Sequence, residues 1–530
     1  MRLHILSAAV LAAACFVAGC GGGGATPASG GGTGSGTTPD MGTLTAVNDS
    51  YQFKLKNAAS GLVLGISAQS QTAGASLVQE ADTGSADSLW HAMPMSNNQS
   101  NIENMLTHQV MGIQSASTAT GAQALQWADN GTADHLWQFY VLTDGNYLIR
   151  NVNSGLYLED ANSSTSTSAT IDQGARATTG SGCTCQEWAI TQTTTPAYPA
   201  PRTVNGTGVY VHDPFLLKDP SGTYWLYGTH QSLASSTDLT TFTYYQNCTT
   251  AQRGGYTAYC PIIGPDFPSW TGLQTPPSWN NGANTDVWAP SLMVVNGTYY
   301  LYYAIPYEPS TGAEALIGLA TSNSPTGPWA DAGWVVKSWT SSTTPPAGFT
   351  TTAYNAIDPA PFIDAGGNWW LVFGSWADGI HLIQLDPATG LRSTTNTTLY
   401  TIARRGSPSA GEEGPFIYYW NGYYYYFAPI NLCCNGVSST YRIIVGRSQT
   451  VTGPYLDRGG IDLMQGGGTI LLSAHANING PGGQSLFTDD ANGTQLPTLV
   501  YHYYDGNTNG TPTLGINRLG FDADGWPYVE

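Results

Sequence analysis

His212-Asp213-Pro214, followed by TYWLYG over residues 223–228, sets out a plan that the sequence repeats four more times. Each copy places a Pro beside a polar or small residue, then an apolar strand, a Gly or Asn turn and an aromatic strand. The further copies are Trp288-Ala289-Pro290 with TYYLYYA, Ile357-Asp358-Pro359 with NWWLVFGSW, Glu413-Gly414-Pro415 with YYYYFA, and Gly480-Pro481-Gly482 with LVYHYYD. Repetition of this kind indicates one structural unit that is used five times.

The spacing of these copies predicts a radial fold. Pro214, Pro290, Pro359 and Pro415 follow one another at intervals of 76, 69 and 56 residues, which is enough for four strands in each unit. Aromatic side chains that alternate along half-buried strands pack between neighbouring sheets, and radial repetition protects the sheet edges. We therefore expect a five-bladed β-propeller over residues 197–530. A β-sandwich is the alternative, and five matched units argue against it.

A second repeat covers residues 48–196. Three units of short strands and Gly, Asn or Ser turns follow one another at intervals of 47 residues, and four extra residues precede the last Trp. The matching positions are Gly61, His108 and Gly155; Gln79, Gln126 and Gln173; and Trp90, Trp137 and Trp188. One such unit cannot bury its apolar face alone, so we expect the three to close into one β body.

This three-unit segment resembles the ricin-type β-trefoil, a family that includes carbohydrate-binding modules. The closing Gln-x-Trp motif of that family is present as Gln186-Glu187-Trp188 and is altered before Trp90 and Trp137. We expect the three Trp side chains in the core of the trefoil, and we assign no sugar-binding residue to it. The expected organisation is all-β, with a β-trefoil preceding the five-bladed β-propeller.

Residues 1–19 are typical of an export signal rather than of folded structure. One basic residue precedes an apolar run that is too short to span a bilayer, and the run ends in Val-Ala-Gly before Cys20, which resembles a bacterial lipobox. The resemblance implies cleavage before Cys20 and acylation of its thiol; an ordinary secretory signal is the alternative. We expect residues 20–47 to form a flexible tether, rich in Gly, Ser and Thr. We expect an exported bacterial lipoprotein at the outer membrane or cell surface, which contacts the membrane only through a lipid anchor at Cys20.

The composition narrows the choice of partner. The 530 residues include 16 basic and 35 acidic side chains, and the net charge is −19. Such a chain repels phosphates, which argues against nucleic acid. Its 31 Tyr and 16 Trp exclude a disordered chain and suit a neutral polysaccharide that stacks on aromatic rings. We expect a monomer with a polysaccharide substrate.

Six cysteines remain beyond the signal and the lipid site. Cys248 and Cys260 enclose a loop rich in Tyr and Gly and could pair, because export permits disulfides. Cys433 and Cys434 are adjacent and could close only a small strained ring. None of the six has zinc-ligand spacing with neighbouring His residues, so we expect no structural metal at the cysteines.

Asp213, Asp358 and Glu413 occupy matching places in the first, third and fourth copies of the propeller unit. The innermost strands of a propeller begin at one end of a central channel, so we expect the three carboxylates to converge. A single Asp-Pro usually marks a turn, but three matched acids in a chain with few charges indicate a site. Like charges in a narrow pocket raise one another's pKa, which can leave one group protonated and another ionised. Cleavage of a glycosidic bond requires one such acid and one such base.

Seven motifs within residues 205–530 carry a family resemblance. They are VHDP at 211–214, VWAP at 287–290, NAIDP at 355–359, EEGPF at 412–416, CCNGVSSTYRIIVGRS at 433–448, YHYYD at 501–505 and LGFDADGWP at 519–527. Together they resemble glycoside hydrolase family 43, and the 433–448 run with the GWP ending is similar to its endo-1,5-α-L-arabinanases. The resemblance implies a five-bladed propeller, inverting chemistry and an arabinan substrate such as the side chains of pectin.

The resemblance also implies a role for each carboxylate. Asp213 would be the general base that activates water, Glu413 the general acid that protonates the leaving oxygen, and Asp358 the group that orients Glu413 and holds up its pKa. Glu412 is the rival for the acid, but Glu413 directly precedes Gly-Pro as the motif requires. Inversion implies that the base and acid carboxyl groups lie roughly 6.5–9.5 Å apart.

Further residues match family positions that bind substrate or a cation. Trp288 matches an aromatic platform for a furanose ring, and its alternative is packing between blades. Asn355 and Ser375 match contacts to sugar hydroxyls. His502 matches a His beside a calcium or other cation that is held mostly by waters, since calcium prefers oxygen ligands; its alternative is a buried core histidine. His212 lies beside the base and receives no further role.

Two other functions remain open. An exo-α-L-arabinofuranosidase or a β-xylosidase of the same family would carry the same carboxylates, because loops at the channel mouth decide between endo and exo cleavage. A non-catalytic surface carbohydrate-binding protein is the second alternative. The intact Asp213, Asp358 and Glu413 argue against it.

Overall fold

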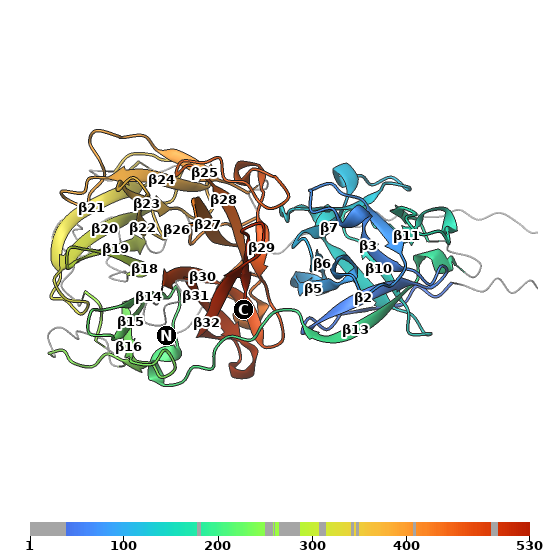
Figure 1. Ribbon diagram of the computed structural model, residues 1–530, viewed down its shortest axis with the longest axis horizontal. Coiled ribbons are helices and arrows are strands. Elements are labelled where there is room, and N and C mark those ends of the chain that lie inside the picture. The colour runs from blue at the N-terminus through green and yellow to red at the C-terminus, as the bar shows by residue number, and fades with distance from the viewer. Residues whose placement is uncertain are drawn as a thin grey trace, which may run out of the picture.

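The computed structural model describes residues 39–176, 182–249, 258, 260–263, 287–306, 314–340, 344–345, 349–405, 410–488 and 497–530. They form two β bodies that lie side by side (Figure 1). The predicted signal and lipobox lie outside the described residues, as does most of the tether, so the lipid anchor stays a prediction. Over the described part of the chain, no helix combines the length and the apolar character that a bilayer crossing needs.

Five four-stranded antiparallel sheets surround a central channel and confirm the predicted propeller (Figure 1). Each sheet keeps its strands in sequence order from the channel outward. The blades are β14 (Phe215–Lys218), β15 (Tyr224–Gly228), β16 (Ser232–Ser236) and β17 (Thr243–Tyr244); β18 (Trp288–Val295), β19 (Thr298–Pro306), β20 (Ala315–Ser322) and β21 (Ala330–Ser338); β22 (Ala360–Ile363), β23 (Trp369–Phe373), β24 (Ile380–Leu385) and β25 (Tyr400–Ala403); β26 (Phe416–Trp420), β27 (Tyr423–Ile430), β28 (Arg442–Ser448) and β29 (Thr469–Leu472); and β30 (Ile478–Thr488), β31 (Pro497–Asp505), β32 (Thr511–Phe521) and β33 (Pro527–Val529).

The aromatic second strand of each blade holds the ring of blades together. Tyr227 of blade one packs with Leu301 and Ile305 of blade two, and Tyr302 of blade two packs with Phe373 of blade three. Fully burying a large apolar side chain contributes roughly 1.5–3 kcal/mol. The innermost strands contact one another in sequence and β14 contacts β30, which closes the ring.

Five equivalent positions line the channel where the innermost strands begin. They share a left-handed backbone, with φ of 49° at Asp213, 42° at Ala289, 56° at Asp358, 52° at Gly414 and 56° at Gly483. A residue other than Gly pays roughly 1–2 kcal/mol for this conformation. The repeat therefore imposes one backbone geometry on two of the acidic residues.

The fifth of these positions differs from the sequence expectation. Gly480-Pro481-Gly482 matches the other copies in sequence, but Gly483-Gln484-Ser485 lines the channel. The reason is the pairing of β30 with β31, which shifts register twice, between Asn479 and Gly482 and again before Ser485. A Cβ at Gly483 would lie 2.5 Å from Asp213 Oδ1, so this position requires glycine.

Thirteen strands build the N-terminal body, which fills the right-hand side of Figure 1. They are β1 (Thr43–Thr45), β2 (Tyr51–Asn57), β3 (Val63–Ile66), β4 (Leu77–Glu80), β5 (Trp90–Pro94), β6 (Ser100–Asn104), β7 (Val110–Ile113), β8 (Ala124–Trp127), β9 (Trp137–Val141), β10 (Tyr147–Asn151), β11 (Tyr157–Asp160), β12 (Ile171–Gly174) and β13 (Trp188–Pro196). Single 3₁₀ turns connect strands of both bodies at η1 (Ser67–Gln69), η2 (Ala86–Ser88), η3 (Ser96–Asn98), η4 (Gln114–Ala116), η5 (Ala133–His135), η6 (Ala161–Ser163), η7 (Thr184–Gln186), η8 (Thr207–Val209), η11 (Gly436–Ser438), η12 (Leu463–Gln465) and η14 (Gly506–Thr508).

The three repeats of this body make the same contacts. Trp90, Trp137 and Trp188 are fully buried in one core, as predicted. Their indole N–H groups donate to the carbonyls of Leu64, Met111 and Leu158 at 3.0–3.1 Å. The repeated Gln side chains also donate to turn carbonyls of a neighbouring repeat, as Gln126 does to Ser70 and Thr72. These residues are structural, and none of the three repeated tryptophans is free as a sugar platform.

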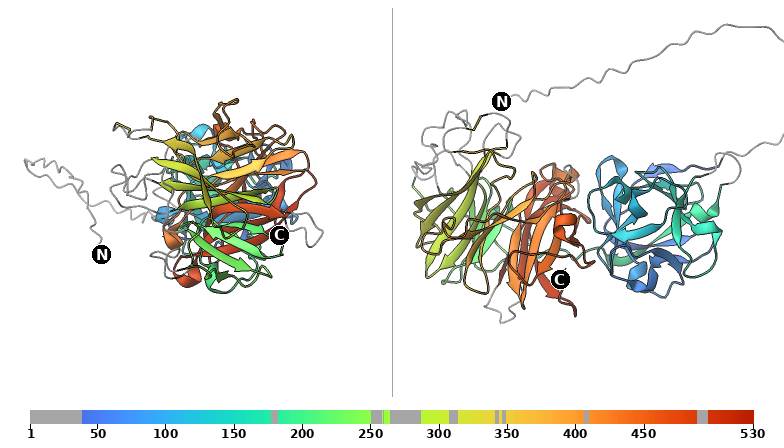
Figure 2. Two further views of the ribbon diagram at one scale, coloured as in Figure 1. Left: turned by 90° about the vertical axis from the view of Figure 1, so that its left-hand side faces the viewer. Right: turned by 90° about the horizontal axis from the view of Figure 1, so that it is seen from above.

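The two bodies are joined by buried contacts as well as by the chain. Met93 and Val110 of the N-terminal body belong to the same apolar cluster as Ile443 of β28 and Ile470 of β29. Figure 2 (right) shows the N-terminal body against the blades drawn in orange and red. The backbone N–H of Ile470 also donates to the carbonyl of His108 at 3.3 Å.

A buried charge cluster lies within this junction. Asp129 of the N-terminal body faces two buried arginines of the propeller, with Oδ2 3.3 Å from Arg442 Nη1 and Oδ1 3.9 Å from Arg405 Nη2. Arg405 also donates to the main-chain carbonyl of Asp129. Burial would raise the pKa of Asp129, but the two guanidinium groups hold it below its ordinary value. The junction is therefore a paired ionic contact inside an apolar surface.

Candidate active site

A cavity of about 590 Å³ opens at the channel end where the innermost strands begin. All five blades contribute to its wall, and Asp213, Asp358 and Glu413 lie together in it, as the repeats predict. Aromatic and apolar side chains form much of the rest, including Tyr210 and Trp288. An apolar pocket with a few converging polar groups is the usual form of a ligand site.

Asp213 is held in place as an ionised carboxylate. Its Oδ2 accepts hydrogen bonds from His212 Nδ1 at 2.8 Å and from the Thr229 hydroxyl at 2.6 Å. Burial would raise the pKa of Asp213, but the charge and hydrogen bond of His212, with smaller effects from His502 and Thr229, hold it well below the ordinary value. Oδ1 accepts no hydrogen bond from the residues that the structure describes. That oxygen is the one left to take a proton.

Glu413 has the opposite protonation. Its Oε2 accepts a hydrogen bond from the Ser375 hydroxyl at 2.7 Å, and its Oε1 accepts one from the Tyr441 hydroxyl. Burial, with repulsion from Asp213, raises the pKa of Glu413 to about 7 in spite of these bonds. Glu413 can therefore carry a proton at a pH where Asp213 is ionised.

Asp358 is the third carboxyl group of the cavity. Its Oδ2 accepts a hydrogen bond from the backbone N–H of Gly414 at 3.0 Å, which ties it to the residue after Glu413. Burial and repulsion from Glu413 and Asp213 raise the pKa of Asp358 well above its ordinary value. Three carboxyl groups thus share a site that tolerates little negative charge.

The three carboxylates do not occupy one repeat position. Asp213 and Asp358 stand at the left-handed channel position, whereas Gly414 takes that position in blade four. Glu413 lies one residue earlier, where blade two has Trp288. Glu413 has a longer side chain than Asp and starts one residue earlier, so it reaches the same cavity from a different direction.

Glu412 is separated from the cavity and does not compete with Glu413. Its side chain is 3% exposed, and its Oε1 accepts a hydrogen bond from the Tyr426 hydroxyl at 2.7 Å within blade four. Burial raises the pKa of Glu412, and the charge of Arg405 partly offsets the effect. This carboxyl group belongs to the core that leads towards the junction with the N-terminal body.

The three residues predicted to bind substrate lie in different surroundings. Trp288 lies on the cavity wall at the start of β18. Ser375 is buried behind Glu413 and bonds to it, so any sugar contact by Ser375 stays a prediction. Asn355 is also buried, and its Oδ1 makes no hydrogen bond to the described residues. Its predicted role is likewise untested by this geometry.

His502 is fully buried on β31 beside Asp213. Its ring stacks on His212 with centroids 3.8 Å apart, and its Nδ1 accepts the backbone N–H of Asp213 at 3.1 Å. Burial, with the charge of His212, lowers the pKa of His502 well below its ordinary value. A neutral ring that accepts at Nδ1 carries its proton on Nε2, and this atom has no partner among the described residues.

This arrangement fits a cation only if a water lies between it and His502. A protonated Nε2 donates rather than ligates, so His502 would hold a water of the cation's shell and not the cation itself. The nearest other groups that could ligate a cation are the His212 imidazole and the Asp213 carboxylate. That set is poor in the oxygen ligands that calcium prefers, and water would have to supply the rest.

Sequence reasoning missed several groups that shape the site. Thr229 bonds Asp213 and also accepts the backbone N–H of Ala289 at 2.9 Å. Tyr441 bonds Glu413, and the Tyr504 hydroxyl lies 2.8 Å from His212 Nε2. Tyr441 sits in the 433–448 run that carried the resemblance, but the sequence does not tell which residue of that run faces the acid.

The three disulfides in the described part of the chain join near neighbours in sequence. Cys248 pairs with Cys260 as the loop between them suggested, and Cys183 pairs with Cys185 in the N-terminal body. Cys433 and Cys434 pair with each other. This last pair lies on the wall of the cavity.

Comparison with known proteins follows the two bodies. The model for glycosyl hydrolases family 43 matches residues 207–527, and the ricin-type beta-trefoil lectin domain-like model matches residues 43–127 and 133–199. An extracellular endo-alpha-(1->5)-L-arabinanase 1 of Bacillus subtilis (strain 168) is 38% identical over 325 residues, which cover 60% of this chain and 87% of the relative. A probable arabinan endo-1,5-alpha-L-arabinosidase A of Aspergillus clavatus is 34% identical over 333 residues, which cover 60% of this chain and 90% of the relative.

A solved structure gives the same result for the fold. The GH43 endo-arabinanase from Bacillus licheniformis superposes with a TM-score of 0.50 at 34% sequence identity, and covers 62% of this chain and 99% of its own. The matched part is the propeller, and the N-terminal body is a ricin-type trefoil of the lectin-like class. The chain therefore belongs to glycoside hydrolase family 43, and it is a glycoside hydrolase with a ricin-type β-trefoil at its N-terminus.

Proposed function

We propose that this enzyme cleaves α-1,5-linked L-arabinan internally and with inversion of the anomeric configuration. The observation that carries the proposal is the opposite protonation of two carboxyl groups in one cavity: Asp213 is ionised, and the pKa of Glu413 is raised to about 7. The relatives described as endo-arabinanases support the choice of substrate.

Each step uses one of these groups. Asp213 Oδ1 takes a proton from a water as the water oxygen bonds to the anomeric carbon. The bond from that carbon to the leaving oxygen breaks, and Glu413 gives its proton to that oxygen. His212 and Thr229 keep Asp213 ionised and oriented, and Asp358 accepts the backbone N–H of Gly414 beside Glu413. Burial and repulsion from Asp213 keep Glu413 protonated.

We include a calcium or similar cation near His502 in the proposal, with an electrostatic role only. When bound through water, it would supply positive potential below Asp213. The chain's own residues perform the proton transfers described above, and no step requires the cation.

The product profile on linear 1,5-arabinan tests the proposal. We expect a mixture of oligosaccharides within the first minutes, and proton NMR of the fresh products is expected to show β-anomers before mutarotation. Release of arabinose alone from the start would contradict internal cleavage. Fresh products with retained α-configuration would contradict the assignment of Asp213 as a base.

A further inference from the structure

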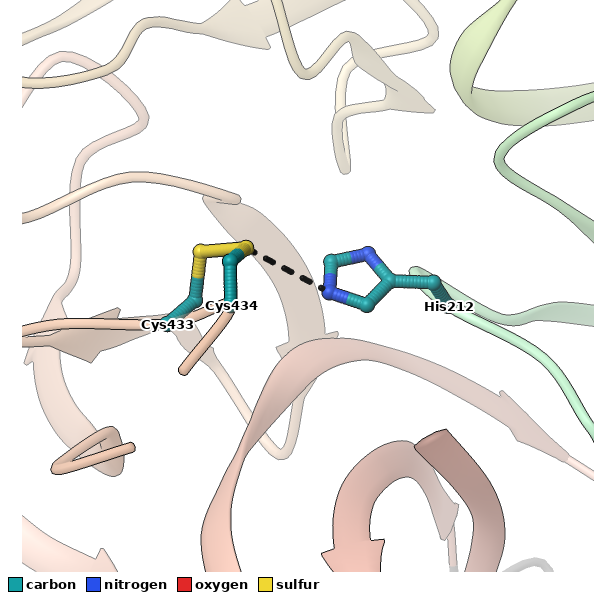
Figure 3. A group of neighbouring side chains, drawn as sticks. All are labelled: His212, Cys433 and Cys434. Atoms are coloured by element: carbon teal, nitrogen blue, oxygen red, sulfur yellow. Dashed lines mark hydrogen bonds between the residues drawn. A yellow bond between two sulfur atoms is a disulfide. The ribbon is translucent and has the colours of Figure 1, made fainter. Parts of the chain in front are cut away.

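The Cys433–Cys434 disulfide is exposed inside the catalytic cavity. It follows β27 by three residues, and Cys434 is exposed while Cys433 is half-buried. Figure 3 shows its sulfur atoms turned towards the His212 ring, with Cys434 Sγ 3.7 Å from Nε2. His212 in turn bonds the base at 2.8 Å. His212 thus contacts both the disulfide and Asp213.

The loop that carries the disulfide is braced on several sides. The backbone N–H of Thr440 donates to the Leu432 carbonyl at 2.8 Å, and that of Asn435 donates to the Ser439 hydroxyl at 3.0 Å. The neighbouring Gly436 packs so closely on Gly510 of blade five that a Cβ at Gly510 would lie 2.6 Å from its Cα. The sulfur atoms therefore occupy a fixed place on the wall.

The backbone of the disulfide is also held from blade five. The N–H of Cys434 donates to the Tyr504 hydroxyl at 2.8 Å. That hydroxyl lies 2.8 Å from His212 Nε2 and donates to Cys434 Sγ at 3.6 Å. Apart from these long contacts of Cys434 Sγ with the Tyr504 hydroxyl and with His212 Nε2, the two sulfur atoms have no hydrogen-bond partner among the described residues.

The chemistry of the sulfur face differs from that of the polar groups nearest to Asp213. Around the reacting groups the wall presents carboxylates, imidazole and hydroxyl groups, which suit the polar edges of a sugar. A disulfide is uncharged, does not titrate, and has soft polarizable sulfur atoms that favour contact with apolar groups. A furanose ring has an apolar C–H face as well as hydroxyl edges, so it needs both kinds of surface.

We propose that the Cys433–Cys434 disulfide is an apolar platform for the sugar ring bound beside Asp213, and that it determines affinity for the substrate. This inference rests on the proposed function. It assigns the disulfide to ground-state and transition-state binding alike, so its loss raises KM while kcat is kept.

The test compares two pairs of cysteines in the full chain. Cys433→Ala with Cys434→Ala is expected to raise KM for linear arabinan about tenfold, with kcat within about threefold of wild type, which is a binding loss of about 1.4 kcal/mol. Cys183→Ala with Cys185→Ala, in the N-terminal body, is the matched control and is expected to leave both constants unchanged. Thermal unfolding of each variant shows that it is folded.

A reductant gives a second, independent measurement. Dithiothreitol is expected to raise KM of the wild type and of the Cys183/Cys185 control, and to leave the Cys433/Cys434 variant unchanged. An active, folded Cys433/Cys434 variant with wild-type KM would overturn the inference. So would a fall in kcat at constant KM, which would make the disulfide a support of the base through Tyr504. Failure of the wild type to cleave arabinan would overturn the proposed function as well, and is seen before any variant is compared.

Discussion

Among the described residues, the charge clusters of the active site and of the junction are built on opposite rules. At the active site, Asp213, Asp358 and Glu413 are three acids in one cavity, and two of them have raised pKa values. At the junction of the two bodies, Asp129 lies between Arg405 and Arg442, and its pKa is lowered. Like charges that repel cost stability and create reactivity, whereas opposite charges that pair hold surfaces together.

Pairing of buried charges at the junction extends beyond Asp129. A neighbouring buried carboxyl, Glu103, bonds His91 at 3.2 Å, His108 at 2.8 Å and the Tyr198 hydroxyl at 2.6 Å. Burial would raise the pKa of Glu103, but the two histidines lower it to about 2. At the active site, by contrast, Asp213 Oδ1 is left open among the described residues. An open oxygen is a cost for folding and a requirement for a base.

The largest expected effect separates activity from stability at the active site. Glu413→Gln removes the proton donor, and we expect kcat on linear arabinan to fall about 10²–10⁴-fold. The same change removes a buried carboxyl that repels its neighbours, so the unfolding free energy at pH 8 is expected to be no lower than that of wild type. Initial rates and urea unfolding measure the two effects.

A rate within tenfold of wild type would contradict the assignment of Glu413 as the acid. The matched control is Glu412→Gln, since Glu412 is the neighbouring acid that lies outside the cavity. Its effect on kcat is expected to be much smaller than that of Glu413→Gln.

The second prediction concerns the junction, where we expect a loss of stability with little loss of activity. Asp129→Asn leaves two buried arginines without their anion, and we expect a loss of about 3–5 kcal/mol in unfolding free energy. At temperatures where the variant is folded, kcat is expected to stay near that of wild type, because the site keeps all its carboxyl groups.

A partly exposed ion pair in the same region is the control for Asp129. Arg458 Nη2 lies 2.8 Å from Asp522 Oδ2, and the Asp522 side chain is 27% exposed. Asp522→Asn is expected to change the unfolding free energy by less than about 1 kcal/mol. Equal losses for the two variants would contradict the view that pairing at Asp129 holds the junction.

The smallest predicted effect is a shift in pH dependence. Ser375→Ala removes a hydrogen bond that stabilises ionised Glu413, so its pKa rises above about 7. The acid works only when protonated, and kcat/KM of the wild type is expected to fall as the pH rises through about 7. In the variant this fall is expected to move to higher pH, by roughly half a unit to one unit.

The pH profiles of kcat/KM for the two enzymes measure that shift. Ser236→Ala offers a control, because Ser236 makes the same kind of bond to Asp238 at 3.0 Å on an outer strand of blade one. A shift to lower pH in Ser375→Ala would show that the Ser375 hydroxyl does not stabilise the carboxylate.

Local pattern predicted most of the fold and the membership of the site. The aromatic strands that follow Pro214, Pro290, Pro359 and Pro415 define blades because a period of two and a turn are local properties of the chain. The same pattern misplaced the fifth channel residue by three, from Gly480 to Gly483. Two register shifts in β30 cause this, and they depend on pairing with β31 rather than on the residues of β30 alone.

The amino-acid sequence by itself determined five blades, three trefoil repeats and the gathering of Asp213, Asp358 and Glu413 at one channel. Only the tertiary structure decided which carboxyl group is ionised, because a pKa depends on burial and on charges that are distant in sequence. It also decided that Tyr441 and Ser375 bond Glu413, that a disulfide lines the cavity, and that Asp129 pairs with the propeller. Repeats specify backbone position, whereas charge and contact follow distance in space.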